Sequence, residues 1–172
     1  AIKELNKKFD KYEGEIIVSK EKIEEAIKKV DQKTKDDVQF AYERVRKFAE
    51  HQLKSMNNNF EVELSKGLFA GQRLIPVETA GCYIPGGRYA HISSAVMAIT
   101  PAKVAGVEKI ICASPPKGND GANAGIIYAA NLCGANTIMN LGGVAAIGAL
   151  THGLFGNPPV DFLVGAGNQY VA

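Results

Sequence analysis

Cysteine and histidine are scarce in this sequence, which has three of each among 172 residues. Cys82, Cys112 and Cys133 lie far apart in apolar stretches and form no Cys-x-x-Cys pair. We therefore expect buried thiols in a reducing compartment such as the cytoplasm. The histidines are isolated and share no ligand spacing with a cysteine or a carboxylate. The sequence predicts no self-contained metal site and no nucleophile paired with a catalytic base.

Charge of one sign and long apolar runs are also lacking. The net charge of +2 and the pI near 8.4 are too small for the basic face of a nucleic-acid-binding protein. No apolar run approaches the roughly 20 residues of a membrane-spanning helix. The N-terminus has no apolar stretch typical of a signal peptide. We therefore expect a cytoplasmic protein that binds neither nucleic acid nor membrane.

Glycine is nearly absent from one half of the chain and abundant in the other. Residues 1–66 hold 15 lysines and arginines, 14 aspartates and glutamates and a single glycine, whereas residues 67–172 hold 17 of the 18 glycines. This shift divides the chain into a helical N-terminal segment with the start of a hairpin, 1–66, and a truncated Rossmann-like α/β domain, 67–172.

The charged half predicts two amphipathic helices and a hairpin. Ser19 can cap a helix whose apolar residues Ile23, Ala26, Ile27 and Val30 form one stripe. Thr34 and Asp37 resemble a capping box before a second helix, which the asparagines at 57–59 end. Alternating apolar residues around two glycines predict a hairpin or two short strands over 60–77.

The glycine-rich half alternates short apolar runs with small-residue helices. Strands are predicted at 81–84, 109–113, 137–141 and 161–164, and helices at 93–105, 123–133 and 144–150. This alternation indicates an α/β fold with a Rossmann-like parallel sheet and flanking helices. Glycine or proline clusters follow each strand, at the carboxyl edge where such sheets bind ligands.

The first of these clusters, Gly86-Gly87, has the placement of a phosphate-binding turn. It follows a strand and precedes a helix, so backbone N–H groups can approach an anion at the helix N-terminus. The segment is not Gly-x-Gly-x-x-Gly. From the residues alone, a nucleotide site and a plain tight turn are equally compatible with it. Gly142-Gly143 has the same placement, and there a plain strand-to-helix turn is favoured.

Four ordered motifs resemble those of the histidinol dehydrogenase family. They are Val77-Glu78-Thr79-Ala80-Gly81-Cys82-Tyr83-Ile84-Pro85-Gly86-Gly87 continuing to Val107, Cys112-Ala113-Ser114-Pro115-Pro116, Leu141-Gly142-Gly143-Val144-Ala145-Ala146-Ile147, and Val160 through Val171. The resemblance implies a zinc-dependent, NAD-linked homodimer that oxidises L-histidinol to L-histidine in histidine biosynthesis. It also implies a polypeptide about two and a half times as long, whose zinc ligands and Glu-His acid/base pair lie beyond the matched segments.

The resemblance assigns cofactor contacts to individual residues. The family's tyrosine falls on Tyr83 and its asparagine on Asn168, and both side chains can bond a nucleotide or serve a purely structural role. A third contact, the family's glutamine, falls on Ala145, whose side chain has no polar group. The proline of the family's Gly-Pro-Gly-Asn segment is Ala166. Tyr83, Asn168 and the Gly86-Gly87 turn make up the expected NAD site.

The loop after Gly87 departs from the biosynthetic enzymes. It reads Arg88-Tyr89-Ala90-His91 and is similar to a paralogous branch that acts on other alcohols, including sulfopropanediol. Arg88 can bind a sulfonate or carboxylate with two parallel hydrogen bonds, and His91 can face the same substrate, although both also suit a surface loop. A third hypothesis is a binding or assembly domain without catalysis, in keeping with Ala145.

Overall fold

The computed structural model describes residues 2–56, 59–86 and 90–166. Its elements, in chain order, are α1 (Ile2–Leu5), η1 (Asn6–Asp10), α2 (Lys20–Lys29), α3 (Gln32–Ser55), β1 (Asn59–Ser65), β2 (Leu68–Arg73), β3 (Thr79–Tyr83), α4 (Ile92–Val104), β4 (Lys109–Ser114), η2 (Gly118–Asp120), α5 (Ala124–Cys133), β5 (Thr137–Asn140), α6 (Gly143–His152) and β6 (Phe162–Gly165). Within the described ranges, no helix has the length and apolar character needed to cross a bilayer.

The centre of the molecule is a four-stranded parallel sheet in the order β5-β4-β3-β6. The first strand of the sheet, β3, lies in the middle. β4 and β5 follow outward on one side of it, and β6 pairs with its other side. The order is thus 3-2-1-4, which is how the strand order of a doubly wound sheet begins. The predicted Rossmann-like α/β fold is therefore confirmed, and the strand order reverses between β3 and β6.

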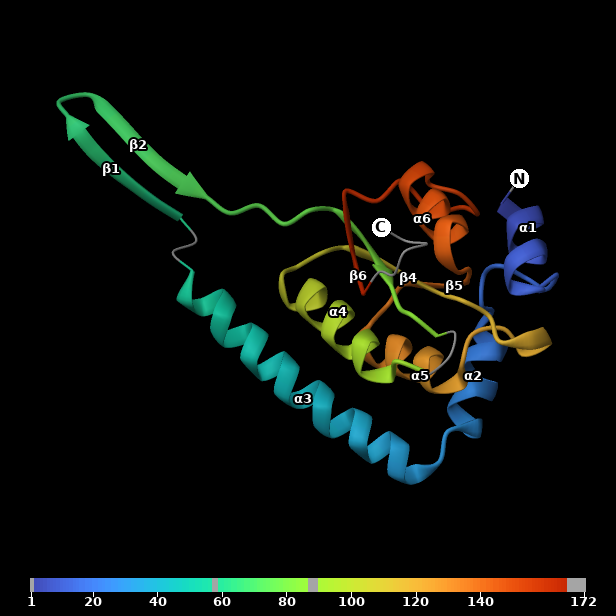
Figure 1. Cartoon of the computed structure of the whole chain (residues 1–172). Coiled ribbons are helices and arrows are strands. Elements are labelled where there is room, and N and C mark those ends of the chain that lie inside the picture. The colour runs from blue at the N-terminus through green and yellow to red at the C-terminus, as the bar shows by residue number, and fades with distance from the viewer. Residues whose placement is uncertain (1, 57–58, 87–89, 167–172) are drawn as a thin grey trace.

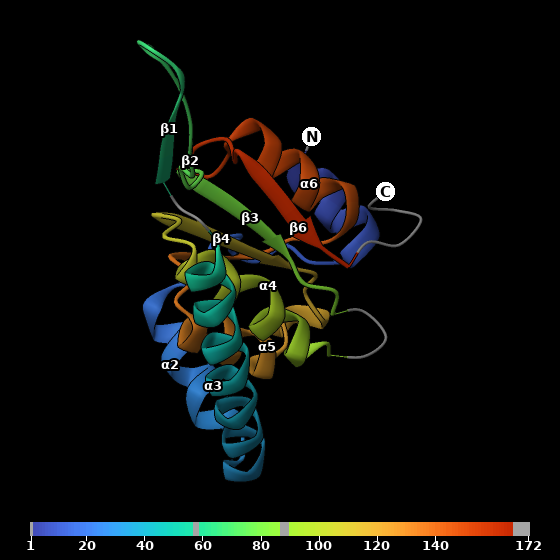
Figure 2. The same ribbon diagram turned by 90° about the vertical axis from the view of Figure 1, so that its left-hand side faces the viewer.

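Helices cover both faces of the sheet (Figures 1 and 2). Alternation along each strand sends Cys82 toward α4 and α5, whereas Tyr83 joins the core on the α6 side. The same alternation separates Ile110 from Ile111 on β4. Burial on both faces is why the strands are continuous apolar runs and not alternating ones.

The charged N-terminal half packs on the α4–α5 side through its two long helices. Ser19 accepts a bond from the Lys22 amide, which confirms the predicted cap of α2. The cap of α3 differs from the prediction. Asp31 accepts from the Thr34 amide at 2.9 Å and starts the helix earlier, because its carboxylate meets the free amides of the first turn better than Thr34 would.

Two further boundaries differ from the sequence analysis. The helix predicted to begin at Ser93 begins at Ile92, and its N-cap is His91, which makes no capping side-chain bond. The helix continues through Pro101, the position at which a kink or a restart is expected from the missing donor. The Cys133 helix ends as predicted at Gly134, whose φ of 93° suits glycine.

The predicted hairpin is present as the antiparallel pair β1–β2. It projects away from the body of the molecule (Figure 1), and every one of its residues is exposed. Its turn contains Gly67 at φ 82°, so the compositional boundary between 66 and 67 falls at the tip of this hairpin. Phe60, Val62 and Leu64 remain open to solvent along β1.

Candidate functional site

The carboxyl ends of the four parallel strands meet at one edge of the sheet. Ser114 and Gly165 end β4 and β6, and Gly86 and Gly142 lie in the segments that follow β3 and β5, so the predicted glycine and proline clusters lie at this edge. The strand order reverses between β3 and β6. Doubly wound sheets bind their ligands at the carboxyl edge, next to such a reversal. We call the carboxyl ends of β3, β4, β5 and β6 and the segments that follow them the glycine rim.

Tyr83 stands at the carboxyl end of β3 with its ring buried under α6 and 4% of the residue exposed. Its hydroxyl oxygen accepts a hydrogen bond of 3.3 Å from the backbone amide of Gly143, the first residue of α6. Burial raises the pKa of the phenol, and the nearby Asp10 carboxylate raises it further. Tyr83 is therefore a neutral side chain that fills core and reaches the rim only with its hydroxyl.

Asp10 reaches the same turn from the far end of the sequence. The N-cap of α6 is Gly142, which has no side chain to accept a bond, and the carboxylate of Asp10 accepts the Gly142 amide instead. Burial raises the pKa of Asp10, and the bond from Gly142 partly opposes this shift. The Gly143 amide is thus bonded to Tyr83, and a carboxylate lies beside Gly142, which disfavours a phosphate at this turn.

The turn after β3 has a different character. A Cβ placed on Gly86 would lie 2.9 Å from the Ser114 hydroxyl oxygen and 3.3 Å from the Ile126 side chain. Ser114 is fully buried at the end of β4, and its hydroxyl has no hydrogen-bond partner in the part of the chain that the structure describes. We call the tight space between Gly86 and the Ser114 hydroxyl the cradle. Protein atoms already line it, so a residue larger than glycine would clash there, and the hydroxyl beside it is unsatisfied.

Asn140, at the end of β5, fixes the segment that carries Asp10. Its side-chain amide donates to the Tyr12 hydroxyl at 3.1 Å and to the Glu15 carbonyl at 2.8 Å, while its oxygen accepts from the Ala122 amide at 2.8 Å. Its backbone carbonyl accepts from the Asn6 side chain at 3.2 Å. Sequence reasoning missed both Asn140 and Asp10, because no local motif marks partners more than a hundred residues apart.

The structure brings together only part of the expected NAD site. Tyr83 and Gly86 lie on the rim, as does Ala145, which is buried on α6 as a core residue. His91 is exposed at the start of α4, and its backbone amide donates to the Pro85 carbonyl at 3.4 Å. Gly87, Arg88 and Asn168 lie outside the described residues, so their predicted roles stay predictions.

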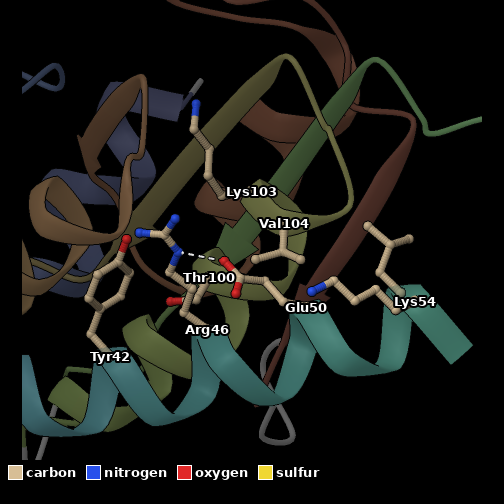
Figure 3. Close-up of a pocket in the computed structure, with 8 residues that line it drawn as sticks. Tyr42, Arg46, Glu50, Lys54, Thr100, Lys103 and Val104 are labelled. Atoms are coloured by element: carbon tan, nitrogen blue, oxygen red, sulfur yellow. Dashed lines mark hydrogen bonds and ion pairs between the residues drawn. The ribbon is translucent and has the colours of Figure 1, made fainter.

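Neither a metal site nor the described pocket adds to the rim. The described residues contain no group of three histidine, cysteine or acidic side chains that could hold a metal. A pocket of about 370 Å³ lies between α3 and α4 (Figure 3), and its lining residues belong to these two helices and not to the rim. Arg46 and Glu50 form an ion pair of 2.9 Å along α3, at the wall of this pocket. Lys54 and Lys103 come from the last turns of the two helices, where cations offset the helix dipoles.

Comparisons with known proteins agree with this architecture. The family model described as histidinol dehydrogenase matches residues 1–172. A histidinol dehydrogenase homolog of Pelagibacter ubique is 71% identical over 169 residues, covering 98% of this chain and 40% of that protein. Sulfopropanediol 3-dehydrogenase of Ruegeria pomeroyi is 52% identical over 165 residues, covering 96% and 38%.

The fold matches that of a solved histidinol dehydrogenase. The crystal structure of histidinol dehydrogenase from Elizabethkingia anophelis superposes with a TM-score of 0.91 at 34% identity, over 99% of this chain and 39% of that chain. The chain therefore spans about 40% of the length of the relatives that it matches.

Proposed function

Because the chain belongs to the histidinol dehydrogenase family, we propose that residues 1–172 form the cofactor-binding side of an NAD-dependent alcohol dehydrogenase. The observation that carries this proposal is the cradle at Gly86, with the unsatisfied Ser114 hydroxyl beneath it, at the point where the strand order reverses. A dinucleotide needs a close backbone approach and polar groups at this edge of the sheet.

Each residue of the rim has a defined part in this proposal. Gly86 lets the backbone approach the diphosphate, and the Tyr83 hydroxyl offers a bond to the dinucleotide. Gly87 and Asn168 complete the site, as the family resemblance implies. NAD, when bound, supplies the acceptor for the hydride that leaves the alcohol carbon. The described residues do not fit zinc, so we place the family's metal ligands and its acid/base pair outside residues 1–172.

Two substrates compete within this function. Histidinol is the substrate that the family description names, and the solved histidinol dehydrogenase is 34% identical to this chain. Sulfopropanediol is named for a relative that is 52% identical. The higher identity of this relative supports sulfopropanediol as the alternative to histidinol. The guanidinium of Arg88, which can bind a sulfonate with two hydrogen bonds, supports it as well.

The whole enzyme is proposed to act as a homodimer, which light scattering of a full-length relative tests.

Calorimetric titration of the 172-residue chain with NAD tests the cofactor proposal. We expect saturable binding to the wild type and at least tenfold weaker binding to the Gly86→Val variant, whose side chain fills the cradle. Gly67→Val, at the tip of the exposed hairpin, is the matched glycine control. Absence of NAD binding to a folded wild-type chain would refute the proposal. Turnover of histidinol by these residues alone would refute the placement of the catalytic groups elsewhere.

A further inference from the structure

The hairpin β1–β2 has one charge-free face and one charged face. Cross-strand partners lie on the same face of a sheet, and successive residues of a strand lie on opposite faces. The antiparallel register pairs Val62 with Ala70 and Glu63 with Phe69. The charge-free face, which we call the arm face, therefore consists of Phe60, Val62, Leu64, Leu68, Ala70 and Gln72.

The arm face is open to solvent. The exposed fractions of its large apolar residues are 44% for Phe60, 47% for Val62, 63% for Leu64 and 56% for Leu68. The hairpin projects away from the body of the molecule (Figures 1 and 2), so within the described ranges no helix covers it. A two-stranded hairpin without such cover is marginally stable at best in water. A second polypeptide surface is therefore expected on the arm face.

The exposed apolar surface of the hairpin is extensive enough for an interface between two copies of the chain. Leu74 and Ile75, which are 40% and 73% exposed, continue it toward β3. With the arm face they expose apolar surface on the order of 500 Å² per copy, and a specific interface buries at least about 1,000 Å² over both partners. Two copies that pack through this surface therefore reach the threshold.

The distribution of charge favours a copy of the same surface as the partner. The arm face has no ionised side chain, so two such faces meet without like-charge repulsion and offer nothing to a strongly charged partner. Glu61 and Glu63 lie on the opposite face, in water. Pairing β1 edge to edge with a second β1 about Val62 would set Glu61 opposite Glu63, which is unfavourable. Packing face to face avoids this.

We propose that the arm face is a self-association surface, which packs against the same face of a second copy across a two-fold axis. The proposal rests on the homodimer of the proposed function and adds the surface that joins its subunits. The hairpin leads into β3 at the amino edge of the parallel sheet, opposite to the glycine rim. Association through the arm face therefore leaves the rim open to a dinucleotide.

Sedimentation velocity of the 172-residue chain over a range of concentrations tests the proposal. We expect a reversible monomer–dimer equilibrium, with a dimer dissociation constant at least tenfold higher for Val62→Lys, which buries an unpaired charge in the interface. Glu61→Lys is the matched control. It places the same side chain at the neighbouring position of β1 but on the charged face, so the dissociation constant should stay at the wild-type value.

Chemical cross-linking gives a second measurement that needs no charged variant. The three native cysteines are buried, so a cysteine introduced on β1 offers the reactive thiol. A short bis-maleimide should join two copies of Val62→Cys and should leave Glu61→Cys largely as single chains. Cross-linking through position 61 in place of position 62 would overturn the proposal.

The remaining outcomes separate this inference from the cofactor proposal. A chain that sediments as a monomer at every concentration would assign the arm face to a different polypeptide and overturn the inference. A dimer that Val62→Lys does not weaken, or that Glu61→Lys weakens equally, would overturn it as well. NAD binding by such samples would leave the cofactor proposal standing. A dimer that is weakened by Val62→Lys alone but binds no NAD would refute the cofactor proposal and leave the inference intact.

Discussion

The backbone amide of Gly143 donates a hydrogen bond of 3.3 Å to the hydroxyl of Tyr83. The bond joins the carboxyl end of β3, the first strand of the sheet, to the start of α6, sixty residues later in the chain. Together with the carboxylate of Asp10 on Gly142, it satisfies amides that α6 cannot satisfy itself. The residue expected to touch the cofactor is therefore also part of the scaffold.

Removing this hydroxyl should cost stability. Tyr83→Phe leaves the Gly143 amide without its acceptor in a half-buried position, and we expect a loss of about 1 kcal/mol in the free energy of unfolding. Urea denaturation followed by circular dichroism measures the change. Tyr128→Phe, on a partly buried tyrosine of α5, is the control and should cost less. Equal stability of Tyr83→Phe and the wild type would show that the 3.3 Å bond contributes nothing.

The cradle at Gly86 makes a prediction about packing. Gly86→Ala brings a Cβ to 2.9 Å from the Ser114 hydroxyl oxygen, and such overpacking costs about 1–3 kcal/mol. Ser114→Ala removes that oxygen, so the double variant should recover part of the loss. A double-mutant cycle of unfolding free energies measures this coupling. Strictly additive effects would place the strain elsewhere, for example against Ile126.

Asn140 should be the most sensitive polar position of the N-terminal attachment. Asn140→Ala strips an acceptor from the Ala122 amide and donors from the Tyr12 hydroxyl and the Glu15 carbonyl. Unsatisfied buried groups of this kind cost about 1–3 kcal/mol each. We expect lower stability together with faster proteolysis of the segment before α2. Asn119→Ala, at an exposed position of η2, should behave as the wild type.

The three thiols should be inert in the folded protein. Cys82, Cys112 and Cys133 are buried and free. Burial raises the pKa of Cys82 to about 12 and raises those of Cys112 and Cys133 as well. Because the thiolate is the reactive form, a disulfide reagent at about pH 8 should label none of them until guanidinium unfolds the chain. Rapid labelling of any one in the native state would contradict this burial.

The raised pKa of Asp10 predicts a pH dependence of stability. The folded state binds the proton of this carboxyl more tightly than the unfolded chain, whose pKa is near the ordinary 3.8. The contribution of Asp10 to stability therefore falls as pH rises from below 3.8 through the folded-state pKa. Asp10→Asn should lack this dependence, so its free energy of unfolding should gain on the wild type over that interval. A constant difference between the two across that range would contradict the shift.

Elements with strong local signals were predictable from the sequence. Short-range sequence patterns predict three of these features: the apolar stripe over Ile23, Ala26 and Ile27, the hairpin around Gly67, and the strand-helix alternation beyond residue 78. Boundaries that depend on competition between nearby caps were less so. Asp31, not Thr34, is the N-cap of α3, because its carboxylate accepts the Thr34 amide and so caps the helix three residues earlier.

The sequence by itself determined the fold class, the family and the place of the glycine turns, because periodicity, glycine placement and motif order are local properties of the chain. Only the tertiary structure decided what surrounds each turn. Gly86 and Gly142 look alike in sequence, yet Asp10 and Tyr83 lie against the start of α6, whereas Gly86 packs on Ser114, whose hydroxyl is unsatisfied. These partners are distant along the chain, and packing alone brings them together.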